Sequence, residues 1–304
     1  MKGWIIAAAG VVLAILIAVA GAYLISGGES IVSGNRVAVV SISGVIAMES
    51  ESGLFAEGAT TPEDVKSQIE HALDDDSVKA ILLEVNSPGG SAVASDEIAE
   101  IIKDARKKKP VVAWLGEWAT SGAYYVASAA DYIVASPATV TGSVGVIFIL
   151  PEYSGLMRKV GVNMTVIKAG EYKDFARGYR PLSREEEEML QSVVDEIYDV
   201  FVREVAENRN LSEEYVRERI ASGGVFSAAQ ARELGLVDEI GTRSRALEKA
   251  GELGGIEGKP EEVRYRRKTL FSELFTSAMQ NIGYGFAKGM AEVYSLYGEV
   301  RAAE

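Results

Sequence analysis

The chain has 304 residues, of which 48% are hydrophobic and 25% are charged, and its net charge is −13. This composition is typical of a globular protein with a proper core, and the negative charge argues against nucleic acid as a partner. The chain has no cysteine and one histidine, which excludes disulfides, a thiolate nucleophile and a metal site built from several histidines. No metal and no cofactor are predicted.

Residues 4–25 form a long apolar stretch without a charged side chain. As a helix this stretch would be roughly 33 Å long, enough to cross a bilayer. It is longer than the apolar core of a signal peptide, which predicts an uncleaved anchor, although residues 18–20 also resemble a cleavage site. Lys2 favours a cytoplasmic N-terminus. We therefore expect a single-pass protein of the cell membrane with its bulk outside the cytoplasm.

Four segments are predicted along the chain. They are a transmembrane anchor with a short flank at residues 1–28, a Gly/Ser-rich tether at 29–36, a globular domain at 37–265 and an amphipathic helical tail at 266–304. The tail could pack on a neighbouring subunit, on its own domain or on the membrane surface.

Strand and helix patterns alternate through the globular domain. Apolar runs predict strands at residues 37–42, 80–85, 111–115, 132–135, within 140–149, 163–167 and 236–237. Helical spacing predicts helices at residues 62–73, 93–107, 153–160, 183–209, 212–220 and 227–234. Residues 86–91 and 168–181 are expected to be loops, and 261–268 a polar break. The alternation predicts an α/β fold with a mostly parallel sheet flanked by helices.

A candidate nucleophile lies where the strand at 111–115 ends. Ser121 follows that strand and opens a small-residue helical segment, so backbone N–H groups and the positive end of the helix dipole lie beside its hydroxyl. Small neighbours, Gly122 and Ala123 among them, would let a substrate backbone approach. A serine that only caps the helix would give the same local pattern.

A second loop ends the neighbouring strand. Residues 86–91 read Asn-Ser-Pro-Gly-Gly-Ser, and Gly89 and Gly90 leave backbone N–H groups unblocked by side chains. Such a loop can form an oxyanion cradle, or simply a tight turn, and both can hold at once. The carboxyl ends of parallel strands share one edge of a sheet, the usual place for a site in an open α/β fold.

A serine nucleophile needs a general base. His71 lies off the apolar stripe of its helix and is expected on the surface, so a lysine is the plausible base. A lysine accepts a proton only when neutral, which burial favours. The loop at 168–181 offers Lys168 and Lys173, and the residues alone do not choose between them. Tyr172 and Phe175 could supply a dry pocket.

Several motifs together resemble one family. They are Asn-Ser-Pro-Gly-Gly at residues 86–90, Thr-Ser-Gly-Ala-Tyr-Tyr at 120–125, Thr-Gly-Ser-Val-Gly-Val at 141–146, Glu-Tyr-Lys-Asp at 171–174 and the stretch from Phe226 to Asp238. In this order they are similar to the signal peptide peptidase A family, membrane-anchored Ser/Lys proteases of the ClpP/crotonase-like superfamily. The resemblance covers residues 37–241. It departs at Ala123, where the family often has a second glycine.

The resemblance implies a fold of repeated ββα units and a role for each of six residues. The roles are a nucleophile at Ser121, a general base at Lys173, oxyanion backbone at Gly89, Gly90 and Gly122, and a lysine-orienting serine at Ser143. Ser143 could equally be an ordinary turn serine.

The resemblance also implies partners and substrates. These are hydrophobic peptides, such as signal-peptide remnants left in the membrane, and a homo-oligomeric ring in which two subunits could share one catalytic centre. Three other functions stay open: a membrane protease that cuts stomatin-like proteins, a crotonase-like acyl-CoA enzyme and a non-catalytic membrane scaffold.

Overall fold

The computed structural model describes residues 34–49 and 59–265, and the residues up to Val263 belong to one compact unit. The predicted anchor, most of the tether and the predicted tail lie outside the described residues. Within the described ranges, no helix has the length and apolarity needed to cross a membrane.

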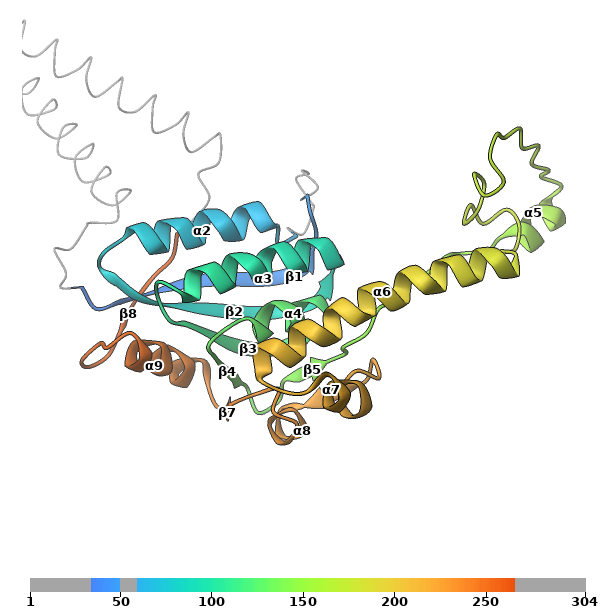
Figure 1. The fold of residues 1–304 in the computed structure, drawn as a ribbon. Helices are drawn as coiled ribbons and strands as arrows, with labels where there is room; N and C mark the ends of the chain where they lie inside the picture. Colours follow the sequence, from blue (N-terminus) through green and yellow to red (C-terminus); the bar gives the residue numbers. More distant parts are fainter. Residues whose placement is uncertain (1–33, 50–58, 266–304) are drawn as a thin grey trace, which may run out of the picture. The chain divides into compact units, whose positions relative to one another are not determined.

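One eight-stranded sheet organises the described part of the chain (Figure 1). Its main path is β6-β5-β3-β2-β1-β8, and β4 and β7 pair outside this path. The strands are β1 (Arg36–Ile46), β2 (Val78–Gly90), β3 (Val111–Thr120), β4 (Tyr132–Ala135), β5 (Val140–Gly142), β6 (Val225–Ser227), β7 (Glu239–Ile240) and β8 (Glu261–Val263). All pairings in this sheet are parallel except that of β5 with β6.

Strand β3 is the centre of the sheet. One of its edges pairs with β2, and the other pairs first with β4 and then with β5. Most of its apolar residues are buried, on both faces, as expected of a parallel strand covered by helices, and Trp118 near its end is exposed. The last residue of β3, Thr120, pairs with Gly142 of β5, so the end of β3 lies between two neighbouring strand ends.

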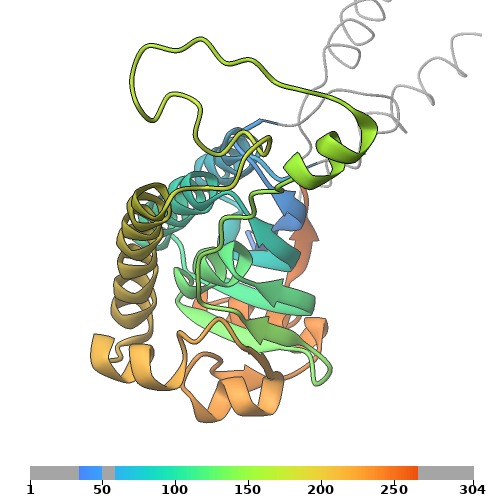
Figure 2. The ribbon, with the colours of Figure 1, turned by 90° about the vertical axis from the view of Figure 1, so that its right-hand side faces the viewer.

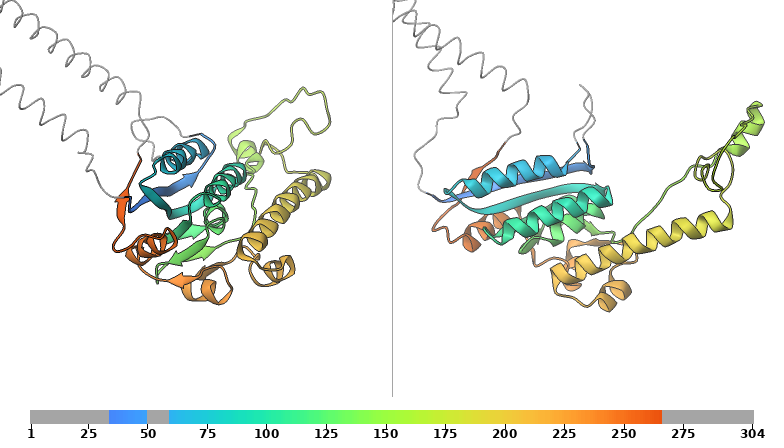
Figure 3. Two further views of the ribbon diagram at one scale, coloured as in Figure 1. Left: turned by 60° about the vertical axis from the view of Figure 1, so that its left-hand side comes forward. Right: turned by 45° about the horizontal axis from the view of Figure 1, so that its top comes forward.

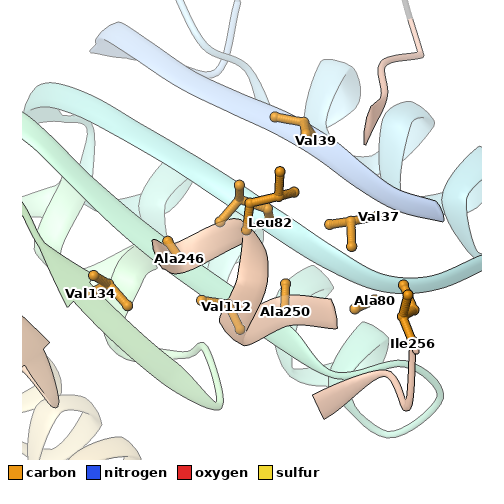
Figure 4. Close-up of a cluster of buried hydrophobic side chains, with 10 residues drawn as sticks. Val37, Val39, Ala80, Leu82, Val112, Val134, Ala246, Ala250 and Ile256 are labelled. Carbon is orange, nitrogen blue, oxygen red and sulfur yellow. The ribbon is translucent and has the colours of Figure 1, made fainter. Parts of the chain in front are cut away.

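Helices cover both faces of the sheet. They are α2 (Pro62–Asp74), α3 (Ala92–Arg106), α4 (Gly122–Ser128), α5 (Ser154–Val160), α6 (Arg184–Arg209), α7 (Glu213–Arg219), α8 (Ala228–Glu233) and α9 (Arg243–Leu253). Figures 1 and 3 show α2, α3 and α4 on one face and α9 on the other. Under α9, Ala246 and Ala250 pack on alternate residues of β1 and β2, including Val39 and Leu82 (Figure 4).

Helix α6 begins at a capping box and packs on the rest of the fold only near its C-terminal end. Ser183 Oγ accepts from the Glu186 N–H, and the Glu186 carboxylate accepts from the Ser183 N–H. Farther along, the Phe201 ring lies 5.1 Å from the Tyr125 ring of α4. Figures 1 and 2 show α5 and the loop that joins it to α6 at the end of α6 remote from the sheet.

The structure confirms most predicted elements and corrects two strands. In the 140–149 region only β5 forms, and residues 163–167 have no regular structure. The side chains of Ile147 and Ile167 are 80% and 97% exposed. These segments are therefore apolar without being covered by any described part of their own chain.

Three boundaries were also wrong. Residues 86–90, expected as a loop, continue β2 because its last two residues pair with Val45 and Ile46 of β1. Residues 236–237 are buried but are not a strand, and β7 follows them. The expected polar break at 261–268 contains β8, which pairs with β1. Helix α9 was not predicted.

Candidate active site

Ser121 occupies a strained turn between β3 and α4. Its backbone has φ 53° and ψ −127°, a conformation that L residues rarely adopt. Its N–H donates to the Gly142 carbonyl at 2.8 Å, and its carbonyl accepts from the Tyr125 N–H at 3.0 Å. The side chain stands at the N-cap position but makes no capping hydrogen bond. The capping interpretation is therefore wrong, and the partly exposed hydroxyl is not engaged in closing the helix.

Gly89 lies directly against this turn. It has φ 100°, and a Cβ there would lie 2.7 Å from the Gly122 nitrogen and 3.0 Å from the Ser121 Cβ. Its own N–H donates to the buried Ser87 hydroxyl at 3.0 Å. Glycine at position 89 thus permits the positive φ and lets the backbone lie against Ser121 and Gly122. Its N–H is already bound to the Ser87 hydroxyl.

Gly90 brings a second backbone N–H to the same place. A Cβ on Gly90 would lie 2.0 Å from the Ile46 oxygen, and a Cβ on Gly122 would lie 3.3 Å from the Gly90 nitrogen. The next N–H, of Ser91, donates to the Ile46 carbonyl at 2.8 Å. Because successive N–H groups of a strand point to opposite edges, the Gly90 N–H faces the β3 side, where Gly122 opens α4.

Side chains near the ends of β2 and β3 hold these two strand ends in register. The Thr120 hydroxyl donates to the Pro88 carbonyl at 3.1 Å. Asn86 Oδ1 accepts from the N–H groups of Glu117 and Trp118, at 3.1 Å and 3.0 Å. The segment that carries both glycines is therefore fixed to β3 at two points just before the serine.

Ser143 follows β5 and lies one residue from the acceptor of the Ser121 N–H. It also has positive φ, 53°, and its N–H donates to the Gly224 carbonyl at 2.7 Å. The structure therefore brings Ser143 to the same sheet edge as Ser121.

Lys173 is not brought to this edge within one chain. It is exposed, and it belongs to the loop between α5 and α6, which Figures 1 and 2 show remote from α4. In the part of the chain that the structure describes, its side chain has no hydrogen-bond or ion-pair partner. The dry pocket expected from Tyr172 is absent from the single chain, since that side chain is 41% exposed.

Lys168, the other candidate base, is already paired. Its Nζ donates to Asp174 Oδ1 at 2.5 Å and to the Glu171 carbonyl at 2.6 Å. Asp174 is buried and also bound by Arg180, which holds the pKa of its carboxyl well below the usual range, with Lys168 adding to the effect. Lys168 is thus engaged by a buried carboxylate, whereas Lys173 is not.

His71 is exposed near the C-terminal end of α2. Its neighbour Ala72 accepts a hydrogen bond from Lys109 just before β3 begins, so His71 lies at the end of β3 opposite to Ser121. In residues 34–49 and 59–265, no cluster of three or more His, Cys, Asp and Glu side chains could hold a metal ion.

Comparison with known proteins assigns the family. The model of Peptidase family S49 matches residues 103–257. A "Putative protease" of Methanocaldococcus jannaschii is 46% identical over 227 residues, covering 74% of this chain and 70% of its own. The chain belongs to peptidase family S49. It is a serine peptidase.

Further relatives of this S49 peptidase are longer than the part they share with it. A "Putative signal peptide peptidase SppA" of Enterococcus faecium is 39% identical and covers 71% of this chain and 63% of its own. Protease 4 of Haemophilus influenzae is 36% identical and covers 72% of this chain but 35% of its own. The chain thus spans only about a third of the length of the latter relative.

A solved structure supports the fold. A mutant of the 1510-N membrane-bound stomatin-specific protease, in complex with a substrate peptide, matches with a TM-score of 0.50 at 17% identity. The match covers 81% of this chain and 98% of that one. At this identity the likeness shows a shared α/β fold and nothing more.

Asn86, Ser87 and Thr120 of this S49 peptidase belong to the sequence motifs, but their structural roles were not predicted. Their signal was available, because short polar side chains at strand ends often hydrogen-bond nearby backbone. Which carbonyl or N–H each one meets depends on the pairing of β2 with β3, which local patterns do not give.

Proposed function

We propose that this S49 peptidase is a membrane-bound endopeptidase in which Ser121 is the nucleophile and Lys173 the general base. The observation that carries the proposal is the strained turn at Ser121, closed against the loop of Gly89 and Gly90. Strain of this kind persists where the surrounding structure enforces it, and it collects at catalytic positions. The turn exposes the hydroxyl beside two backbone N–H groups, the arrangement that acyl transfer requires.

The mechanism follows from these groups. The neutral amine of Lys173 takes the Ser121 hydroxyl proton while Oγ attacks the peptide carbonyl carbon. The developing oxyanion accepts hydrogen bonds from the N–H groups of Gly90 and Gly122. The lysine returns its proton to the leaving amine, which leaves an acyl-serine ester. Water then attacks the ester, with the same lysine as base, and the free acid and serine are released. Ser143 orients the lysine.

The lysine in this proposal comes from a second copy of the chain. Within one chain the loop between α5 and α6 is remote from α4 (Figures 1 and 3), whereas the turn of Ser121 is already formed. The segment around α5 exposes apolar side chains, including Ile147, Phe148 and Leu156 at 80%, 55% and 63%. Covering them with a neighbouring copy would bury apolar surface and complete the site. A closed ring of such copies follows if the contact repeats head to tail.

Substrates are proposed to be hydrophobic peptides, including signal-peptide remnants. Support comes from the apolar stretch at residues 4–25, which would tether the site to the membrane, and from the name of the Enterococcus relative. In this arrangement residues 37–265 form the protease domain, a ClpP/crotonase-like set of ββα units, outside the cytoplasm. A peptide would bind extended, as a strand beside the Gly-Gly loop.

The test is turnover of hydrophobic fluorogenic peptides by the full-length protein in detergent. Ser121→Ala and Lys173→Ala should each lower kcat by about 10³-fold or more, with folding and assembly unchanged. Full turnover in Lys173→Ala would reject the lysine. Thioester hydrolysis without peptide cleavage would favour the acyl-CoA function, and cleavage restricted to stomatin-like peptides would redirect the substrate assignment.

A further inference from the structure

A buried group of charged side chains adjoins Lys173 in the chain. We call it the Asp174 cluster, and it consists of Lys168, Asp174, Tyr179, Arg180 and Glu186. The two carboxylates are its most buried members, with Asp174 8% and Glu186 2% exposed. Carboxylates so deeply buried are stable only when paired and hydrogen-bonded.

Asp174 is satisfied from three sides. Arg180 donates to Oδ1 at 3.0 Å and to Oδ2 at 3.1 Å, a two-pronged contact. Lys168 donates to Oδ1 at 2.5 Å and the Tyr179 hydroxyl donates to Oδ2 at 3.0 Å. The residue that follows Lys173 is therefore fixed in position.

Arg180 joins this carboxylate to a second one. Its two terminal nitrogens donate to the Glu186 oxygens at 2.7 Å and 2.8 Å. Glu186 also accepts from the Ser183 N–H at 2.9 Å, so it closes the first turn of α6. One guanidinium thus ties the loop of Lys173 to the start of α6.

The cluster balances its own charge. Bonds from Arg180, with help from the Ser183 N–H, lower the pKa of Glu186 to about 2, and the pKa of Asp174 is lowered as well. Two carboxylates and two cations therefore coexist at neutral pH, and Lys173 is not one of them. Buried ion pairs are weak sources of stability, but in some proteins they select one geometry among several.

We propose that Arg180 is a positioning residue for the general base, holding the loop of Lys173 in its active shape before the second copy's serine arrives. The inference rests on the proposed function. Arg180 meets neither the substrate nor Ser121; it acts through the backbone of Lys173 and Asp174. The same cluster keeps Lys168 paired, so that a single lysine of this loop is free to act as base.

The test uses full-length protein in detergent and measures kcat and KM for Arg180→Gln. We expect kcat to fall by about tenfold to a hundredfold with KM within about twofold, because a displacement of the base affects the chemical step. Arg184→Gln is the matched control. Arg184 lies one residue into α6 and makes only an exposed pair with Glu188, so its removal should leave kcat within about twofold.

A second background separates positioning from general stability. If Arg180 acts through Lys173, adding Arg180→Gln to Lys173→Ala should change nothing further in the rate at which a fluorophosphonate labels Ser121. The proposal would be overturned if Arg180→Gln lowered the labelling rate equally in the wild-type protein and in Lys173→Ala. Wild-type kcat in Arg180→Gln would also overturn it. If Arg180→Gln does not assemble, Arg180→Lys is measured in the same way, because it keeps the charge but loses the fork that spans two carboxylates.

The two proposals fail differently. Undiminished activity of Lys173→Ala would reject the general base itself. Loss of activity in Lys173→Ala, with Arg180→Gln as active as wild type, would reject only the role of Arg180.

Discussion

The backbone of Ser121 carries a cost that the rest of the turn must offset. A non-glycine residue in such a conformation is destabilised by about 1–3 kcal/mol. The Ser121 N–H bond to Gly142, the Thr120 bond to Pro88 and the start of α4 together enforce it. Such a turn tolerates no bulk beside it, which explains the glycine at position 89.

A side chain at position 89 should disturb the turn of Ser121. In Gly89→Ala the new methyl group would meet the Gly122 nitrogen and Ser121 Cβ, at a φ of 100° that alanine avoids. We expect kcat/KM to fall on the order of 10²-fold, because the nucleophile and its N–H groups shift together. Steady-state kinetics on a hydrophobic peptide measures the change, and the thermal midpoint shows whether the fold survives.

Gly34→Ala is the control for this variant. Gly34 precedes β1, and a Cβ there would lie no closer than 3.4 Å to its nearest neighbour, the Lys79 Cε. Its activity should stay within about twofold of wild type. Wild-type activity in Gly89→Ala would mean that the turn relaxes freely, and that the close approach has no catalytic consequence.

Residues of the nucleophile side could be predicted from sequence because their determinants are local. A strand end, a Gly-Gly pair and small neighbours all lie within a few positions of Ser121 or Gly90. The choice between Lys168 and Lys173 could not be made from residues, since it depends on which lysine Asp174 binds. That pairing depends on how residues 168–186 fold back on α6.

Among the elements, two of the three failed strands share one cause. Residues 163–167 and the end of the 140–149 run are apolar and β-branched, and the pattern was interpreted as burial in the sheet. An apolar pattern predicts that the side chains are buried. It does not show whether they are buried within their own chain or against another molecule. Helices such as α2 and α6 were predictable because their N-caps, Thr61 and Ser183, are visible in the sequence.

The loop between α5 and α6 should come loose in acid. Glu186 has a folded pKa of about 2, lowered from 4.5, so its stabilising contribution is present above pH 4.5. That contribution is lost as the pH falls from about 4.5 towards 2, and the lowered pKa of Asp174 acts in the same direction. We expect pepsin to cut residues 168–186 much faster at pH 2 than at pH 4.5.

Mass spectrometry of the fragments gives the comparison. Cleavage beside Leu253, which is 43% exposed and lies outside the proposed contact between copies, corrects for the pH dependence of pepsin itself. Arg180→Gln should already be cut between 168 and 186 at pH 4.5. A ratio of the two cleavages that does not change with pH would show that the cluster does not hold this loop.

At the scale of the whole molecule, one chain presents half of the proposed site complete and the other half apart. Ser121, Gly90 and Gly122 meet at the carboxyl edge of β2 and β3, while Lys173 stands on a loop braced by its own charged cluster. Each half of the proposed site is ordered without the other, which favours a site assembled from two copies of the chain. Within a single chain, the loop of Lys173 would have to move from the far end of α6 to α4.

Mixed oligomers test this directly. Ser121→Ala and Lys173→Ala are each expected to be inactive, but subunits of one kind can donate the serine and those of the other the lysine. If neighbours share a site and the two variants mix at random when co-expressed, about a quarter of the sites contain both intact residues. Turnover per subunit should then recover to about a quarter of wild type. Separately purified variants that are mixed without subunit exchange provide the control and should remain inactive. Co-expressed variants that assemble together yet show no turnover would place serine and lysine in the same chain, and would require the loop between α5 and α6 to reach its own α4.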